Sequence, residues 1–195
     1  MAYQTYTTDA LVIGSADHLT ADRWIALFTR DAGLVHARAI SVRKEQSKLR
    51  YGLQDFSLAR VSLVRGKSGW RIIGAERAHN LYFATPDREV RAAMLRIVRF
   101  LRRLVQGEET NVPLYDMLID GLVVLASSPG DEIVRVERVL TLRVLSALGY
   151  VAPHSDYRHM LSVPSLGEAL SVTGKETEEQ SIQSAIDEAL AVSQL

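Results

Sequence analysis

The first 77 residues alternate short apolar runs with polar turns, a pattern typical of half-buried β-strands. Five runs rich in Val, Ile, Leu and Ala cover residues 8–16, 22–29, 33–42, 57–66 and 70–77. The sequence Gly66-Lys-Ser-Gly69 predicts a tight hairpin between the fourth and fifth runs. Because an open sheet would expose its edges, five short strands at this spacing favour a closed or nearly closed barrel.

After Thr85-Pro86 the apolar positions recur about every 3.6 residues, which indicates helices. Thr85 suits an N-cap, Pro86 suits the first helical position, and Gly149 suits a C-terminal cap. Helices are predicted over residues 86–107, 113–128, 131–149, 165–171 and 178–193. The chain is therefore predicted to be α+β, with a five-stranded β-barrel over residues 1–80 and a C-terminal α-helical bundle over residues 81–195.

Charge is distributed unevenly along a neutral chain, which has 23 Lys and Arg against 23 Asp and Glu. Residues 1–85 carry an excess of five positive charges, and residues 151–195 an excess of five negative ones. Any polyanion is therefore expected to meet the first half of the chain. No apolar run is long enough to cross a bilayer, the N-terminus lacks the pattern of a signal peptide, and cysteine is absent. These features predict a cytosolic protein that contacts no membrane.

Motifs for catalysis or cofactor binding are not found in the sequence. Gly66-Lys67-Ser68 is similar to part of a phosphate-binding loop, but the earlier glycine is missing and a strand follows. His154, Asp156 and His159 could hold a metal, although a spacing of five does not align two histidines on a helix, and a solvated loop is the alternative. We expect no enzyme activity, no metal, no cofactor and no small-molecule substrate.

A basic stretch, defined as residues 37–57, stands out in the first half. Between Arg38 and Arg50 it holds five cations against the single acid Glu45, and Tyr51, Gly52 and Phe56 follow. A solvated loop and a surface for single-stranded nucleic acid are the alternatives, and the second combines cations with rings that stack on bases. The candidate nucleic-acid contacts are Arg38, Arg43, Lys44, Lys48, Arg50, Arg65 and Lys67.

The first long helix collects arginines on one side. At 100° per residue, Arg88, Arg91, Arg96, Arg99, Arg102 and Arg103 fall within an arc of roughly 140°. Such a face could accept a phosphate backbone or an acidic peptide, or its arginines could pair with acids of neighbouring helices. Arg138 and Arg143 on the third long helix are further candidates for a partner surface.

Several motifs between residues 22 and 57 carry a family resemblance. They are Asp22-Arg23, Leu27 to Arg30, Gly33, Val42-Arg43-Lys44, Ser47-Lys48, Leu53-Gln54 and Phe56. In this order they resemble the N-terminal domain of the recombination mediator RecO family. Residues 139–153 and 185–195 resemble two helices of the same family. Ser41 stands where the family often has glycine, and the chain lacks the four-cysteine zinc module that many members carry.

The resemblance implies an oligonucleotide-binding (OB) barrel followed by a helical domain. It implies a non-enzymatic, cytoplasmic and nucleoid-associated protein that binds single- and double-stranded DNA, anneals strands and helps to load recombinase. The implied partners are RecR, RecA and the acidic tail of the single-strand-binding protein. The charge of the predicted helix over residues 86–107, or of Arg138 and Arg143, could bind that acidic tail. Arg43, Lys44 and Lys48 match the family motif and become the first choice for DNA contacts.

Two other classes of function remain open at this point. A barrel with cations and exposed rings can also bind RNA, so an RNA-binding protein of translation or RNA processing is one alternative. A protein-interaction scaffold would use the same cations in internal ion pairs. A nuclease or ligase is disfavoured because the sequence shows no carboxylate cluster for a metal.

Overall fold

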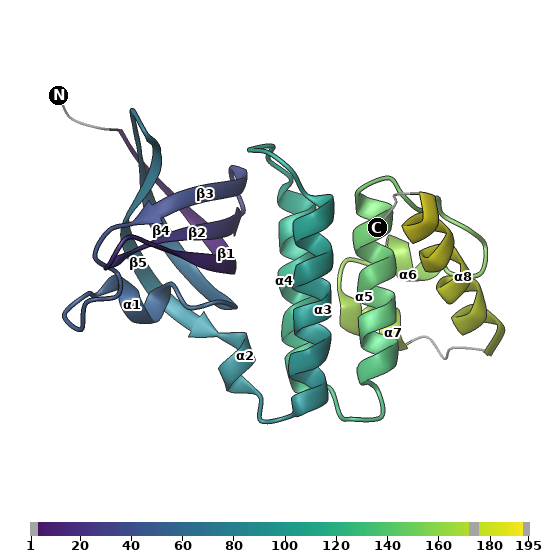
Figure 1. The fold of residues 1–195 in the computed structure, drawn as a ribbon. Helices are drawn as coiled ribbons and strands as arrows, with labels where there is room; N and C mark the ends of the chain where they lie inside the picture. Colours follow the sequence, from purple (N-terminus) through teal and green to yellow (C-terminus); the bar gives the residue numbers. More distant parts are fainter. Residues whose placement is uncertain (1–3, 172–175, 193–195) are drawn as a thin grey trace. The chain divides into compact units, whose positions relative to one another are not determined.

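The computed structural model describes residues 4–171 and 176–192. Strands fill the first part of the chain and helices the remainder (Figure 1). The elements, in chain order, are β1 (Thr5–His18), β2 (Asp22–Thr29), β3 (Gly33–Ala39), α1 (Leu49–Gly52), β4 (Ser57–Gly66), β5 (Gly69–Asn80), α2 (Leu81–Ala84), α3 (Arg88–Leu104), α4 (Val112–Ser127), α5 (Ile133–Ala147), α6 (Arg158–Ser162), α7 (Leu166–Ser171) and α8 (Glu176–Val192).

The five strands close into a barrel in the order β1-β2-β3-β5-β4. All neighbouring strands are antiparallel except β3 and β5, which pair in parallel. Strand β1 is long enough to pair with β4 along its first half and with β2 along most of its length, and a bulge between Val12 and Gly14 bends it. This strand order, with α1 between β3 and β4, confirms the predicted α+β class and the five-stranded OB-fold barrel.

The barrel core comes from residues that alternate along the strands. Val12, Leu27 and Val35 are fully buried, as period-two side chains facing a closed interior should be. Leu53, just after α1, and Val42, in the basic stretch, join the same core. Both ends of the basic stretch are therefore anchored by apolar burial.

Strand boundaries follow the sequence prediction closely, although β1, β3 and β5 differ from it, and β5 covers Gly69–Asn80 rather than residues 70–77. The predicted ranges 22–29 and 57–66 are those of β2 and β4, and Gly66 pairs with Gly69 in the predicted hairpin. Strand β3 ends at Ala39 rather than residue 42, because Ser41 has a φ of 53° that a strand cannot hold. Strand β1 begins three residues earlier than predicted because its first residues pair with β4.

The long helices also agree with the prediction, although the cap of α3 differs. The helix begins at Arg88, and the Asp87 carboxylate accepts the N–H of Glu89 at 2.7 Å, so Asp87 rather than Thr85 caps it. Gly149 has a φ of 82° and ends α5 as predicted. Helices α1, α2 and α6 were not predicted, because four or five residues are too few to show a helical period.

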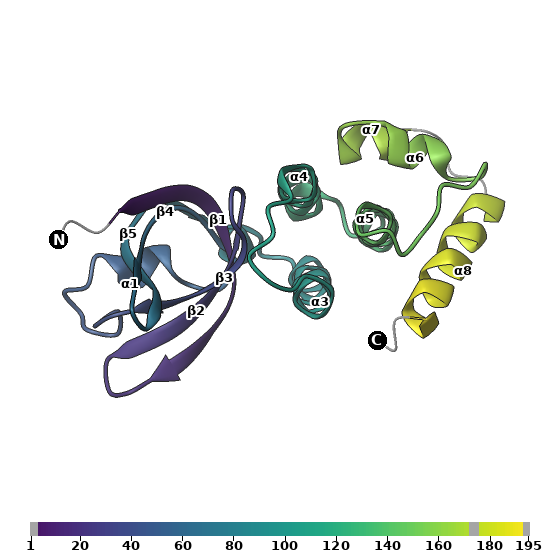
Figure 2. The same ribbon diagram turned by 90° about the horizontal axis from the view of Figure 1, so that it is seen from above.

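The chain divides into two compact units that are not contiguous in sequence. Described residues up to Ala84 and Val105–Tyr115 form the barrel unit, and the remaining described residues form the helical unit. Within the helical unit α5 is central, because it packs against α3, α6, α7 and α8 (Figure 2). Gly121 of α4 approaches Leu140 of α5 so closely that a Cβ would overlap the leucine side chain. A domain boundary between residues 80 and 81 stays a prediction.

None of the helices in the described ranges combines the length and apolar character that crossing a bilayer requires.

Candidate nucleic-acid interface

The start of the basic stretch is fixed by Asp22, the first residue of β2. Its Oδ1 accepts the backbone N–H of Ser41 at 2.7 Å, and its Oδ2 accepts Nη2 of Arg38 at 2.6 Å. The Ser41 hydrogen bond, with the Arg38 hydrogen bond second, lowers the pKa of Asp22 below its ordinary value. The guanidinium of Arg38 is therefore already engaged, and this predicted contact also has a structural role.

Three cations of the basic stretch point into solvent. Lys44, Lys48 and Arg50 are exposed, and no ion pair of theirs is found in the described part of the chain. Consecutive backbone turns, Lys44 N–H to Ser41 O at 3.1 Å and Arg50 N–H to Ser47 O at 3.2 Å, hold the stretch in a compact shape. These three side chains are therefore presented from an ordered loop rather than from a loose tail.

Arg43 is positioned differently from its neighbours. Its Nη1 lies 3.3 Å from Oδ2 of Asp17, and the same carboxylate pairs with Arg23 at 2.8 Å. Both pairs are exposed, so each contributes little to stability and can exchange with another anion. Arg43 thus stays available to a phosphate, at the cost of one weak ion pair.

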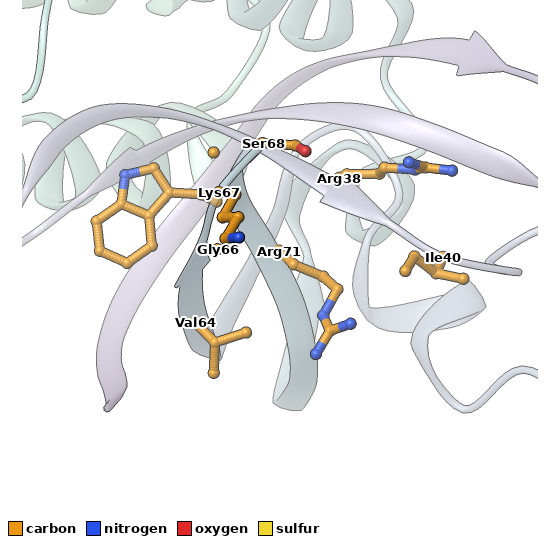
Figure 3. Close-up of a pocket in the computed structure, with 9 residues that line it drawn as sticks. Arg38, Ile40, Val64, Gly66, Lys67, Ser68 and Arg71 are labelled. Atoms are coloured by element: carbon orange, nitrogen blue, oxygen red, sulfur yellow. The ribbon is translucent and has the colours of Figure 1, made fainter. Parts of the chain in front are cut away.

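A second group of cations surrounds a pocket of about 220 Å³ beside the β4–β5 hairpin. Arg38, Lys67 and Arg71 line it, and Figure 3 shows them around the pocket with Ile40 as an apolar member. The parallel register of β3 and β5 places Arg38 opposite Arg71. The β2–β3 face and the β4–β5 loop are also where OB folds bind oligonucleotides.

The aromatic residues of the basic stretch differ in availability. Tyr51 of α1 is 71% exposed and presents its ring to solvent. Phe56 stacks on Tyr82 with ring centroids 5.2 Å apart, and its N–H donates to Val12 O at 2.8 Å. Tyr51 is therefore available for stacking on a base, whereas Phe56 holds the barrel end in place.

The arginine face of α3 is only partly free of internal partners. Arg96 forms a bidentate pair with Glu137 of α5 at 2.6 Å, and this hydrogen bond raises the pKa of Arg96. Arg91 donates to the carbonyl oxygen of Thr85 at 2.9 Å. Four arginines of this helix are exposed and show no partner within residues 4–171 and 176–192: Arg88, Arg99, Arg102 and Arg103.

The two candidates on α5 are engaged inside the helical unit. Arg138 pairs with Glu179 of α8 at 3.1 Å. Arg143 is only 7% exposed, and its Nη2 donates to the carbonyl oxygens of Val163 and Pro164 at 2.8 and 3.0 Å. Burial lowers the pKa of Arg143. The prediction of an exposed partner surface at Arg143 is thus corrected, because the side chain points inward and crosslinks α5 to the loop before α7.

The segment that holds His154, Asp156 and His159 shows no metal-binding geometry. Asp156 accepts hydrogen bonds from Ser181 at 2.7 Å and Ser155 at 3.0 Å, which lower its pKa. His154 Nδ1 lies 3.5 Å from the same carboxylate. Over the described residues, no three His, Asp or Glu side chains converge as metal ligands do.

Comparison with known proteins finds a family model that is similar to the barrel. Residues 1–79 match the family model described as Recombination protein O N terminal. The barrel is therefore similar to the N-terminal domain of RecO proteins. All seven barrel candidates, from Arg38 to Lys67, lie inside the residues that match the RecO model.

Curated RecO relatives extend the similarity beyond the barrel. The DNA repair protein RecO of Heliobacterium modesticaldum is 31% identical over 145 residues, which cover 74% of this chain and 52% of that protein. The same protein of Myxococcus xanthus is 31% identical over 116 residues, covering 59% and 48%. That of Pelotomaculum thermopropionicum is 28% identical over 145 residues, covering 74% and 56%. The chain spans about half the length of the curated RecO proteins that it matches.

Two neighbours of Trp70 in the barrel cannot be predicted from the sequence. Tyr6 precedes the first predicted strand, and Glu108 lies in the segment between α3 and α4, yet both lie against Trp70. Only the strand register and the path of the chain bring them together. Arg71 was visible as a cation near the hairpin, but its alignment with Arg38 required the parallel pairing of β3 with β5.

Proposed function

We propose that this chain is a RecO-family, non-enzymatic recombination mediator in DNA repair that binds single and double DNA strands on the basic surface of its barrel. The observation that carries the proposal is the position of Lys44, Lys48 and Arg50, which are exposed on an OB barrel and have no ion pair among the described residues. The pocket lined by Arg38, Lys67 and Arg71 extends the positive surface. The names of the curated relatives, DNA repair protein RecO, support the same process.

The proposed mechanism is electrostatic. Lysine and arginine side chains displace condensed counterions from the phosphates, and the released ions drive binding. Tyr51 stacks on a base of a single strand, which needs no particular sequence. Two complementary strands whose phosphates are neutralised on one protein repel each other less, so they anneal faster.

The exposed arginines of α3 provide a separate surface for a partner. Arg88, Arg99 and Arg103 have the charge to bind DNA or the acidic tail of the single-strand-binding protein. Arg91 and Arg138 are already engaged and contribute less. In this role the chain acts in the cytoplasm at the nucleoid, together with RecR and RecA, and helps to load the recombinase on coated DNA.

The test compares two triple variants that remove the same charge. Lys44→Ala/Lys48→Ala/Arg50→Ala changes the barrel, and Arg88→Ala/Arg99→Ala/Arg103→Ala changes α3. Fluorescence anisotropy with a labelled single-stranded oligonucleotide is measured over a salt series. The barrel variant is expected to bind at least about tenfold more weakly and to lower the slope of log Kd against log salt by about 2, because each lost phosphate contact removes about 0.7.

The helix variant is the matched comparison: an unchanged slope assigns the exposed arginines of α3 to a protein partner, and a lowered slope adds them to the DNA surface. Equal affinity of the barrel variant and wild type would contradict the assigned surface. Competition with an RNA oligonucleotide of the same sequence tests the RNA-binding alternative, since selective RNA binding needs recognition of the 2′-hydroxyl. A scaffold protein would bind neither strand in a salt-dependent way.

A further inference from the structure

Three barrel strands bring an exposed aromatic and cationic cluster together, which we call the Trp70 cluster. It consists of Tyr6 of β1, Arg65 of β4 and Trp70 of β5. The Tyr6 and Trp70 ring centroids are 5.3 Å apart with an edge-to-face angle of 86°, and Arg65 Cζ lies 5.3 Å from the Trp70 ring centroid. Tyr6 is 44% exposed and the Arg65 side chain 65% exposed. The cluster therefore offers a ring and a guanidinium to solvent beside the hairpin that carries Lys67.

A carboxylate from a distant part of the chain occupies the donors of this cluster. Trp70 Nε1–H donates to Oε1 of Glu108 at 2.9 Å, and Arg65 Nη1 lies 3.7 Å from Oε2 of the same side chain. An indole N–H and a guanidinium are also the donors that bind a phosphate oxygen. Glu108 therefore stands where an anionic ligand of the cluster would stand.

The backbone around Glu108 is attached to the barrel independently of its side chain. Leu34 N–H donates to Gly107 O at 3.0 Å, and Thr110 Oγ1 donates to Asp31 O at 2.8 Å. Gly33, with a φ of 64°, lies so close to the Glu109 backbone that a side chain there would overlap it. The Glu108 side chain can therefore leave the cluster by rotation while its backbone stays in place.

The ion pair between Glu108 and Arg65 does not explain the cluster as a stabilising device. An exposed ion pair at 3.7 Å contributes little to stability because water and salt screen it. A phosphate brings more charge and more acceptor oxygens than a carboxylate, so it competes well for the same donors. The exposed Tyr6 ring adds the stacking surface that a base requires.

We propose that the Trp70 cluster is a subsite for one nucleotide of a single strand, and that Glu108 is its built-in competitor. The phosphate replaces the Glu108 carboxylate at Arg65 and Trp70 Nε1–H, and the base stacks on Tyr6. The subsite rests on the proposed function, because it extends the same nucleic-acid surface. It lies outside the basic stretch and uses a residue from beyond the strands of the barrel.

The first test removes the competing charge. Glu108→Gln keeps the shape and an acceptor for Trp70 Nε1–H, and Glu109→Gln is the matched control, since Glu109 is exposed one residue away. With a labelled oligothymidine, Glu108→Gln is expected to bind about three- to tenfold more tightly than Glu109→Gln at low salt. The slope of log Kd against log salt should become steeper by up to about 0.7, because Arg65 is no longer neutralised by an internal carboxylate before it meets the phosphate.

The second test addresses the base. Tyr6→Leu keeps an apolar residue on β1 but removes the ring, and it is expected to weaken oligothymidine binding about fivefold or more. Binding of an abasic strand of the same length should not change. Equal affinity of Glu108→Gln and Glu109→Gln, or an equal loss on both strands for Tyr6→Leu, would overturn the subsite. A wild-type chain that binds no oligonucleotide would instead overturn the proposed function.

Discussion

Asp22 accepts a hydrogen bond of 2.7 Å from the backbone N–H of Ser41, which ties the residues after β3 to the start of β2. The same carboxylate holds Arg38, and Arg43 N–H donates to Ala21 O at 3.0 Å. The basic stretch therefore leaves the barrel from a fixed point. This order lowers the entropy that Lys44, Lys48 and Arg50 lose when they meet a phosphate backbone.

Asp22→Asn should lower the free energy of unfolding at pH 7, since it leaves Arg38 without its carboxylate. The pKa of Asp22 lies below its ordinary value of 3.8 in the folded chain. The stabilisation is therefore fully present above that value and is lost as the pH falls through the lowered folded pKa. Urea denaturation of both proteins from pH 7 to pH 3 should show the difference shrinking only at the acidic end. Asp55→Asn, at an exposed carboxylate, is the control, and a constant difference across all pH values would contradict the assignment.

Ser41→Gly should stabilise the chain by about 0.5–1 kcal/mol, because Ser41 has a φ of 53° that glycine adopts without steric cost. Urea denaturation measures the change in the free energy of unfolding. Ser47→Gly, in the same stretch but without a positive φ, should leave stability equal or lower. Similar effects of the two substitutions would show that the backbone conformation of Ser41 is not strained.

Gly33→Ala should destabilise the barrel unit by about 2–4 kcal/mol, because it adds left-handed strain to an overlap with the Glu109 backbone. Gly107→Ala is the matched control, since Gly107 also has a positive φ but no atom lies near a Cβ there. The control should cost only about 1 kcal/mol. Thermal unfolding of the two variants distinguishes them, and equal losses would argue against close packing of this segment on β3.

Arg143→Ala should lower the free energy of unfolding by about 2–4 kcal/mol, because it empties a buried position and leaves two carbonyl oxygens without a donor. Arg99→Ala, on the exposed face of α3, should change stability by no more than about 0.5 kcal/mol. Chemical denaturation measures both. An unchanged free energy of unfolding for Arg143→Ala would contradict the buried structural role, and Arg143 would again be a candidate for a surface contact.

Much of the barrel was predictable because the apolar pattern of a strand and the residues of a turn are read from neighbouring positions in the sequence. A short apolar run between polar turns located β2, alternation of buried and more exposed positions is seen in β4, and Gly66 and Gly69 located the hairpin. The end of β3 was wrong by three residues, since the positive φ of Ser41 has no signal in apolar patterning. Helix α1 was hidden by its length of four residues.

The candidate site was predictable in composition but not in geometry. Charge counting found Lys44, Lys48 and Arg50, which the structure leaves exposed. Charge counting could not distinguish these exposed cations from Arg38, which is paired with Asp22. That partner lies 16 residues away in the sequence, and the pairing of β2 with β3 brings the two side chains together. The buried position of Arg143 was equally inaccessible, because it depends on how α5 packs against the loop at Val163.

The discontinuous barrel unit has a consequence for how the protein is made. Its last described piece, Val105–Tyr115, follows Ala84 only after α3 has been synthesised, and Tyr115 packs its ring 5.6 Å from that of Phe28. At about 5–20 residues per second, the ribosome needs about 2–6 seconds to add the 31 residues from Ala84 to Tyr115. Until that segment has been added, Phe28 lacks the Tyr115 ring against which it packs in the folded barrel unit, so the barrel unit cannot complete its packing from its five strands alone.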